Sequence, residues 1–124
     1  MVQSISLYER IGGAEAVKAA VALLYDKILS DPLLVPFFQD IDVDRLRSSQ
    51  SAFVSMAFGG PVNYSGADMR RAHERLVQRG LSDAHFDKVA FHLKTAMEDL
   101  SVPPSLIIEA LSIVETTRPD VLNR

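Results

Sequence analysis

His73 carries the side chain best suited to chemistry in this sequence. In the segment GADMRRAHERLV it stands four residues after Met69 and three before Leu76. On a helix, this spacing turns all three side chains toward the interior. A buried neutral imidazole requires a hydrogen-bond partner or a metal. The position of His73 alone leaves both roles open, and a structural core histidine is the commoner of the two.

Two further polar residues, Gln50 and Tyr25, stand within or beside apolar stripes of predicted helices. Gln50 stands between Leu46 and Phe53 at helical spacing, so it is expected in the middle of a buried face. A buried amide without a partner costs about 1–3 kcal/mol. Tyr25 flanks another stripe, and its hydroxyl also needs a partner if it is buried. Each is usually a structural residue, but together with His73 they predict one metal-centred pocket open to a diatomic gas.

The metal is expected to be carried by haem. No carboxylate and no second histidine stand on the His73 stripe, so a bare metal ion would lack ligands there. A porphyrin supplies four nitrogens itself and requires only one histidine from the protein.

The composition limits the class of protein. A chain of 124 residues with 48% hydrophobic and 23% charged residues is typical of one soluble domain, expected to span residues 1–124. A net charge of −3 gives no basic footprint for nucleic acid, and the absence of cysteine excludes disulfides and thiolate sites. The uncharged residues from Phe53 to Ala67 are interrupted by Gly59-Gly60-Pro61, so no membrane span is expected. We expect a cytoplasmic protein, because the first residues lack a signal-peptide pattern. We also expect it to be a monomer.

The elements that must position these residues are predicted to be helical. A short turn opens on the capping pattern of Ser6 and Glu9. Apolar periodicity and cap residues then predict longer helices from Ala14 to Leu29, from Asp42 to the Gly59-Gly60 pair, through His73 to Gly80, from Ser82 through Met97, and from Pro104 through Val114. The result is an all-α domain of five or six helices. Several are too short to be stable without tertiary packing.

The segments resemble, in order, those of the truncated haemoglobins of the first group. The matching strings are SLYERIGG, LLYDKILSDP, PFF, QSAFVSMAFGG, DMRRAHERLV, LSDAHFDKVAFHL and RPDVLNR, which together cover nearly the whole chain. The resemblance implies a two-over-two helical sandwich around a haem b. It also implies that the glycine pairs Gly12-Gly13 and Gly59-Gly60 let the short helices turn.

The resemblance implies a role for each candidate residue. His73 falls where the family has its proximal iron ligand. Tyr25 and Gln50 fall on distal positions that donate hydrogen bonds to bound dioxygen. Phe38 matches a phenylalanine that packs against the porphyrin, and Phe53 matches a distal wall residue.

Three positions depart from common members of that family. Leu46 stands where many members have a distal glutamine, and Ser49 stands where some have a histidine that binds iron as a sixth ligand. Both leave the distal side open. Thr117 replaces a histidine that attaches covalently to haem in those members, so a non-covalent haem is expected.

Other side chains are expected around the haem. Met69 and Leu76 flank His73 on its own stripe. Arg45, together with Arg70 or its neighbour Arg71, could pair with the haem propionates, and Tyr64 could reach a propionate as well. His85 and His92 flank the stripe of the long helix and are predicted to be surface or structural residues.

The predicted function is reversible binding of dioxygen, and of nitric oxide or carbon monoxide, at ferrous iron, for transport or storage. An alternative is a nitric oxide dioxygenase that forms nitrate with the help of an external reductase. A third possibility is a helical interaction module without haem.

Overall fold

The computed structural model describes residues 6–38, 41–60 and 66–124. Within these ranges every regular element is helical, and no strand is present. The elements in chain order are α1 (Leu7–Ile11), α2 (Gly13–Leu29), the 3-10 helix η1 (Val35–Phe37), α3 (Val43–Ala57), α4 (Gly66–Gln78), α5 (Asp83–Asp99), α6 (Pro104–Glu115) and α7 (Arg118–Val121).

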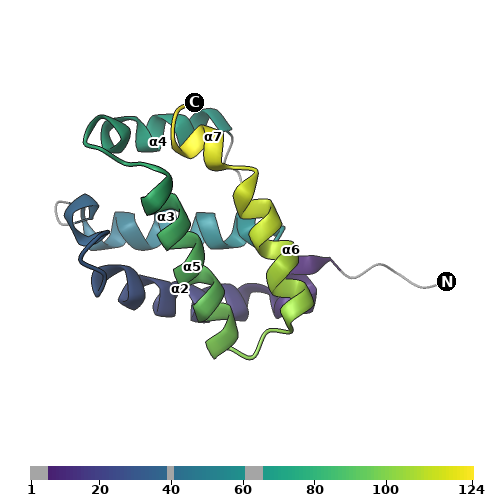
Figure 1. The fold of residues 1–124 in the computed structure, drawn as a ribbon. Coiled ribbons are helices and arrows are strands. Elements are labelled where there is room, and N and C mark those ends of the chain that lie inside the picture. The colour runs from purple at the N-terminus through teal and green to yellow at the C-terminus, as the bar shows by residue number, and fades with distance from the viewer. Residues whose placement is uncertain (1–5, 39–40, 61–65) are drawn as a thin grey trace.

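The four long helices α2, α3, α5 and α6 form two layers. Helix α2 packs beside α3 and α5 packs beside α6, while α5 crosses α2 and α6 crosses α3 (Figure 1). The apolar core fills the space between the two layers. This arrangement confirms the predicted all-α, two-over-two sandwich.

Local sequence signals explain where the helices begin. The Ser6 hydroxyl accepts a hydrogen bond from the Glu9 N–H at 3.2 Å and caps α1. The Asp42 carboxylate accepts from the N–H of Asp44 at 2.7 Å and caps α3. Gly12, with φ of 134°, forms the corner between α1 and α2, a backbone conformation that side chains disfavour.

The buried face of α2 differs slightly from the predicted one. Helical spacing predicts an inward stripe of Val17, Val21, Leu24 and Ile28 on this helix. Leu24 and Ile28 are buried as expected, but Ala20 takes the place of Val21, which is half-buried. On α3, Leu46 and Gln50 are buried as expected, and the buried face continues through Val54. The shift of part of a turn arises because two neighbouring helices contact each of these elements.

The C-terminal residues form a separate helix that is held by ion pairs. The apolar stripe ends with α6 at Glu115, and Pro119 stands in the first turn of α7. The guanidinium of Arg118 lies 2.9 Å from Asp83 and 2.6 Å from Glu115. These contacts fasten α7 to the start of α5.

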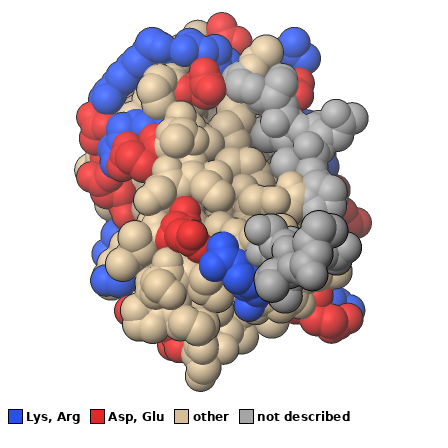
Figure 2. Space-filling model, turned by 90° about the vertical axis from the view of Figure 1, so that its right-hand side faces the viewer, with Lys and Arg blue, Asp and Glu red and all other residues tan. Residues whose placement is uncertain are grey.

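Helix α4 lies at one end of the molecule and packs on α7 (Figure 1). Figure 2 shows the side of the molecule where α1 and α6 lie. Uncharged residues cover much of this face, and acidic and basic side chains lie at its left border and also near its middle. None of the described helices is long and apolar enough to span a membrane.

Candidate functional site

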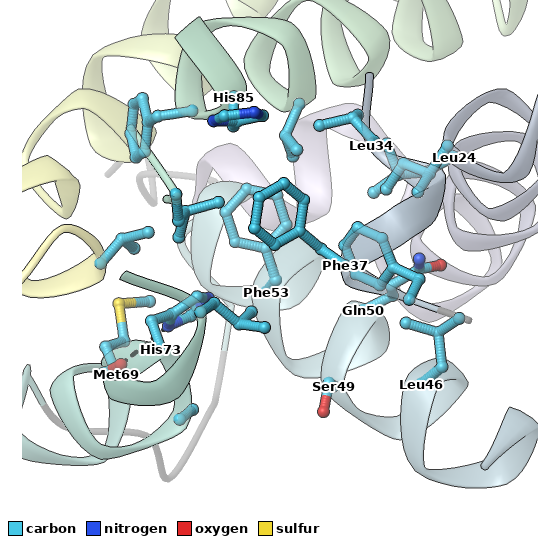
Figure 3. Close-up of a pocket in the computed structure, with 18 of the residues that line it drawn as sticks. Leu24, Leu34, Phe37, Leu46, Ser49, Gln50, Phe53, Met69, His73 and His85 are labelled. Atoms are coloured by element: carbon cyan, nitrogen blue, oxygen red, sulfur yellow. Dashed lines mark hydrogen bonds between the residues drawn. The ribbon is translucent and has the colours of Figure 1, made fainter. Parts of the chain in front are cut away.

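A cavity of about 190 Å³ lies between α3, α4 and α5. It exceeds the engineered cavity of about 150 Å³ that stays dry and binds benzene. Its walls are predominantly apolar. The described lining residues that have nitrogen or oxygen in their side chains are Ser49, Gln50, His73 and His85 (Figure 3).

His73 is half-buried on α4 and faces this cavity. Its Nδ1 lies 2.7 Å from the carbonyl oxygen of Met69, one turn earlier (Figure 3). A carbonyl only accepts, so Nδ1 carries the proton and Nε2 keeps its lone pair. Burial lowers the pKa of the imidazole, although the bond to Met69 acts in the opposite direction. His73 is therefore a neutral imidazole with an unprotonated Nε2, the form that binds metals.

Gln50 lies on α3 with only 5% of its surface exposed. Both of its amide atoms, Oε1 and Nε2, are buried without a hydrogen-bond partner among the described residues. Such a group costs about 1–3 kcal/mol, because it loses its bonds to water and gains none in the protein. Because Gln50 also lines the cavity, this amide is available to a ligand there.

The apolar walls include the predicted positions. Phe38, Leu46, Phe53, Met69 and Leu76 all line the cavity, and Ser49 lies at its edge with an exposed side chain. Figure 3 shows the Ser49 hydroxyl turned away from the other labelled side chains. The structure thus brings these residues from three separate segments to one cavity.

Tyr25 lies outside this cavity in the structure. It is half-buried and lines a second hollow between α2 and α3, where Tyr8 and Ser51 also lie. The guanidinium of Arg47 stands over its ring at 5.0 Å from the centroid, an attractive cation–π contact. That contact accounts for the direction in which the tyrosine points.

The arginines predicted near the propionates also lie outside the cavity lining. Arg45 is exposed in the first turn of α3. Arg70 Nε lies 2.9 Å from the Asp120 carboxylate, and its Nη2 donates to the Arg124 carbonyl at 2.6 Å. Arg70 therefore joins α4 to the C-terminal segment. Tyr64 lies outside the described residues.

His85 is the cavity residue that the sequence did not reveal. It was expected at the surface or in a structural role, but it is half-buried and lines the same cavity as His73. It belongs to a strip of α5 that also includes Phe86, Val89 and Ala90. The apolar periodicity predicts an inward face of α5 that begins at Phe86. Because Phe86 directly follows His85, this pattern is the one sign in the sequence that His85 lies near the interior.

His92 has the structural role predicted for it. Its Nε2 lies 2.6 Å from the carboxylate of Asp31, which is buried at the turn after α2. Asp31 also accepts from the Leu33 N–H at 2.9 Å. These bonds hold the turn before η1 against α5, and η1 brings Phe37 into the cavity wall.

The chain is similar to globins along nearly its whole length. The bacterial-like globin family matches residues 6–123. A group 1 truncated haemoglobin of Chlamydomonas moewusii is 42% identical over 118 residues, which are 95% of this chain and 68% of that protein. Another, from a Synechocystis strain, is 40% identical over 122 residues, which are 96% of this chain and 98% of that protein.

Solved structures agree with these relatives. The 2/2 haemoglobin of a Synechococcus strain, in the cyanomet state and with covalently attached haem, is 42% identical with a TM-score of 0.87, covering 97% of this chain and 100% of that one. The truncated haemoglobin of Tetrahymena pyriformis in its Fe(III) form is 37% identical with a TM-score of 0.84, covering 95% and 98%. This chain belongs to the bacterial-like globin family and is a group 1 truncated haemoglobin.

Proposed function

We propose that this chain binds a non-covalent haem in the cavity faced by His73 and reversibly binds dioxygen there, for storage or transport. The observation that carries the proposal is the pairing of His73 and Gln50 in one apolar cavity. His73 presents an unprotonated Nε2, and Gln50 presents a buried amide without a partner. One group is prepared to bind a metal, and the other to donate to a ligand.

The residues present fit a haem. The walls are predominantly apolar, as the faces of a porphyrin require, and Phe38 and Phe53 supply flat aromatic surfaces. His73 would hold the iron through Nε2, while its Nδ1–H bond to Met69 keeps the ring oriented. A bound haem supplies the iron at which a diatomic gas binds.

Gln50 would stabilise a polar diatomic ligand. Its Nε2–H groups can donate to an oxygen atom that carries partial negative charge, and such bonds contribute about 1.5–3 kcal/mol when one partner is charged. A ligand that carries less charge, such as carbon monoxide, gains less. Leu46 and Phe53 keep water away from this side, which strengthens the remaining bonds.

Tyr25 is proposed as a second donor that turns inward. It directly follows Leu24, which lines the cavity, so it stands at the border between the two hollows. A rotation of its side chain away from Arg47 would bring the hydroxyl toward Gln50. The cost is the exposed cation–π contact, about 0.5–1 kcal/mol, which is less than one charge-assisted hydrogen bond contributes.

A non-covalent haem is supported by Thr117. Its hydroxyl donates to the Val114 carbonyl at 2.7 Å, and the residue is buried at the junction of α6 and α7. A threonine hydroxyl committed to the backbone is a poor candidate for a bond to a haem vinyl group. Acid acetone should therefore extract the haem.

Repeated oxygenation tests the proposal. The haemin-reconstituted protein is reduced, mixed with dioxygen, and then deoxygenated by equilibration with argon, with visible spectra recorded at each step. We expect the ferrous spectrum to return over several cycles. Complete oxidation to the ferric form in the first cycle would contradict reversible dioxygen binding.

A further inference from the structure

His85 is a second histidine on the wall of the cavity, and the function proposed so far does not use it. Figure 3 shows His85 and His73 on opposite walls, with Phe37 and Phe53 between them. His85 comes from α5, whereas His73 comes from α4. The two rings therefore border the same cavity from different sides.

The hydrogen bond at Nδ1 determines the tautomer of His85. Its Nδ1 accepts a hydrogen bond from the backbone N–H of Ser82 at 3.0 Å. Ser82 is the N-cap of α5 and His85 is its third residue, so this bond is half of a capping box. A nitrogen that accepts carries no proton. In the neutral ring the proton must therefore lie on Nε2. This is the opposite of His73, whose Nδ1 donates to Met69.

The two tautomers prepare the rings for different tasks. His73 presents a lone pair, which a metal requires, and His85 presents an N–H, which an anion or a carbonyl requires. Binding of iron by Nε2 of His85 would require moving its proton to Nδ1 and losing the bond from Ser82. The capping bond thus disfavours His85 as a metal ligand and favours it as a donor.

A cation lies on the other side of the aromatic ring that His85 contacts. Its ring packs edge-on against Phe37, with the ring centroids 4.7 Å apart. The guanidinium of Arg79 lies over the same Phe37 ring at 5.9 Å, and it is held there by a bond to the Pro36 carbonyl at 2.9 Å. A carboxylate bound by His85 would therefore have the Arg79 cation on the far side of the same ring.

We propose that His85 binds a carboxylate of the cofactor through Nε2–H and so selects a porphyrin that bears free propionates. The proposal rests on haem binding as set out above. It assigns to His85 the anchoring role that the sequence had suggested for Arg45 and Arg70. The ligand class is a flat apolar molecule with a carboxylate at its edge.

Two substitutions separate the donor from the cap. Asparagine places an amide oxygen near the Nδ1 position, so His85→Asn keeps an acceptor for Ser82 and loses the Nε2–H donor. Glutamine places an amide N–H near the Nε2 position, so His85→Gln keeps the donor. Far-UV circular dichroism and thermal unfolding of the haem-free proteins check that both variants are folded.

The test compares haemin with its dimethyl ester, which lacks free carboxylates. The rate at which each is released to excess apomyoglobin is followed by the change in the Soret band. We expect wild type to release the ester about tenfold faster than haemin, because a charge-assisted hydrogen bond is lost. In His85→Asn the ratio of the ester release rate to the haemin release rate should approach one. In His85→Gln this ratio should stay close to the wild-type value.

Two results would overturn the inference. The first is an ester-to-haemin ratio in His85→Asn equal to that of wild type. The second is an equal acceleration for both porphyrins, which would mean that His85 acts only through the fold. Failure of the haem proposal is distinguishable, because the wild-type protein would then take up neither porphyrin.

Discussion

The Nδ1 atom of His73 lies 2.7 Å from the carbonyl oxygen of Met69, one helical turn earlier in α4. This bond fixes the ring orientation and leaves Nε2 bare toward the cavity. The histidine is thus prepared as a metal ligand by its own helix, before any cofactor is bound.

Removal of the imidazole should abolish stable haem binding. In His73→Gly, we expect the purified protein to lose most of its haem on gel filtration, because no other side chain replaces the iron ligand. Added imidazole should restore the Soret band by entering the space left by the ring. A variant that keeps its haem at the wild-type level without imidazole would show that another residue holds the iron.

Gln50 should show opposite effects on stability and on ligand binding. In Gln50→Leu the unpartnered amide is replaced by a side chain of similar volume, so the haem-free protein should gain about 1–3 kcal/mol in its free energy of unfolding. The dissociation of dioxygen should become about tenfold faster or more, because the donor is lost. Urea unfolding and stopped-flow measurements check the two effects.

The neighbouring exposed residue Ser51 provides a control for Gln50 on the same helix. Ser51→Ala should change neither quantity. Loss of stability in Gln50→Leu would mean that the amide has partners after all.

Tyr25→Phe should speed dioxygen dissociation about tenfold and leave the haem content unchanged. The variant lacks the hydroxyl that would donate to the bound ligand once the ring has left Arg47 and turned inward. Stopped-flow replacement of dioxygen by carbon monoxide measures the rate. The same rate in the variant and in wild type would mean that Tyr25 stays in the outer hollow when the ligand is bound.

The pairing of Asp31 with His92 should make stability depend on pH in acid. Burial alone would raise the pKa of Asp31, but the bonds from His92 and Leu33 and the charge of Lys88 hold it below its usual value of 3.8. A carboxyl whose pKa is lower in the folded state stabilises the fold above its unfolded pKa. That contribution is lost as the pH falls through the folded value.

Asp31→Asn should therefore be less stable than wild type by about 1–3 kcal/mol at pH 7. The difference should shrink below about pH 4, as the wild-type carboxyl becomes protonated. Urea unfolding of both proteins across this range measures it. A difference that stays constant down to the lowest pH would contradict the role given to the Asp31 charge.

Arg70 should hold the His73 helix rather than the haem itself. Its ion pair with Asp120 and its bond to the Arg124 carbonyl tie α4 to the C-terminus, and these contacts are partly exposed. Arg70→Ala should therefore speed the loss of haemin and of its dimethyl ester alike, by about threefold. Arg71→Ala, at an exposed neighbouring position, serves as the control. A selective effect on haemin would instead indicate contact between Arg70 and a propionate.

Much of the fold follows from the sequence because helix signals are local. The caps at Ser6 and Asp42 lie where they were expected, and Gly12 forms the predicted corner. His73 and Gln50 were each predicted to face the interior because each stands on an apolar stripe, and in the structure both line one cavity.

The side-chain contacts between different helices could not be predicted from the sequence. The direction of Tyr25 depends on Arg47, and that of Arg70 depends on Asp120, fifty positions away. His85 was expected at the surface or in a structural role because helical spacing defines a face only to within part of a turn. Its place on the cavity wall depends on how α5 is rotated against its neighbours.

The most direct test of the central claim is a titration of the purified haem-free protein with haemin, followed by visible spectroscopy. The account predicts a Soret band that saturates at one haemin per chain in wild type. Reduction under carbon monoxide should then give the spectrum of a histidine-ligated ferrous haem, and His73→Gly should give neither without added imidazole. A wild-type protein that takes up no haemin, or a His73→Gly variant that binds it as wild type does, would contradict the account.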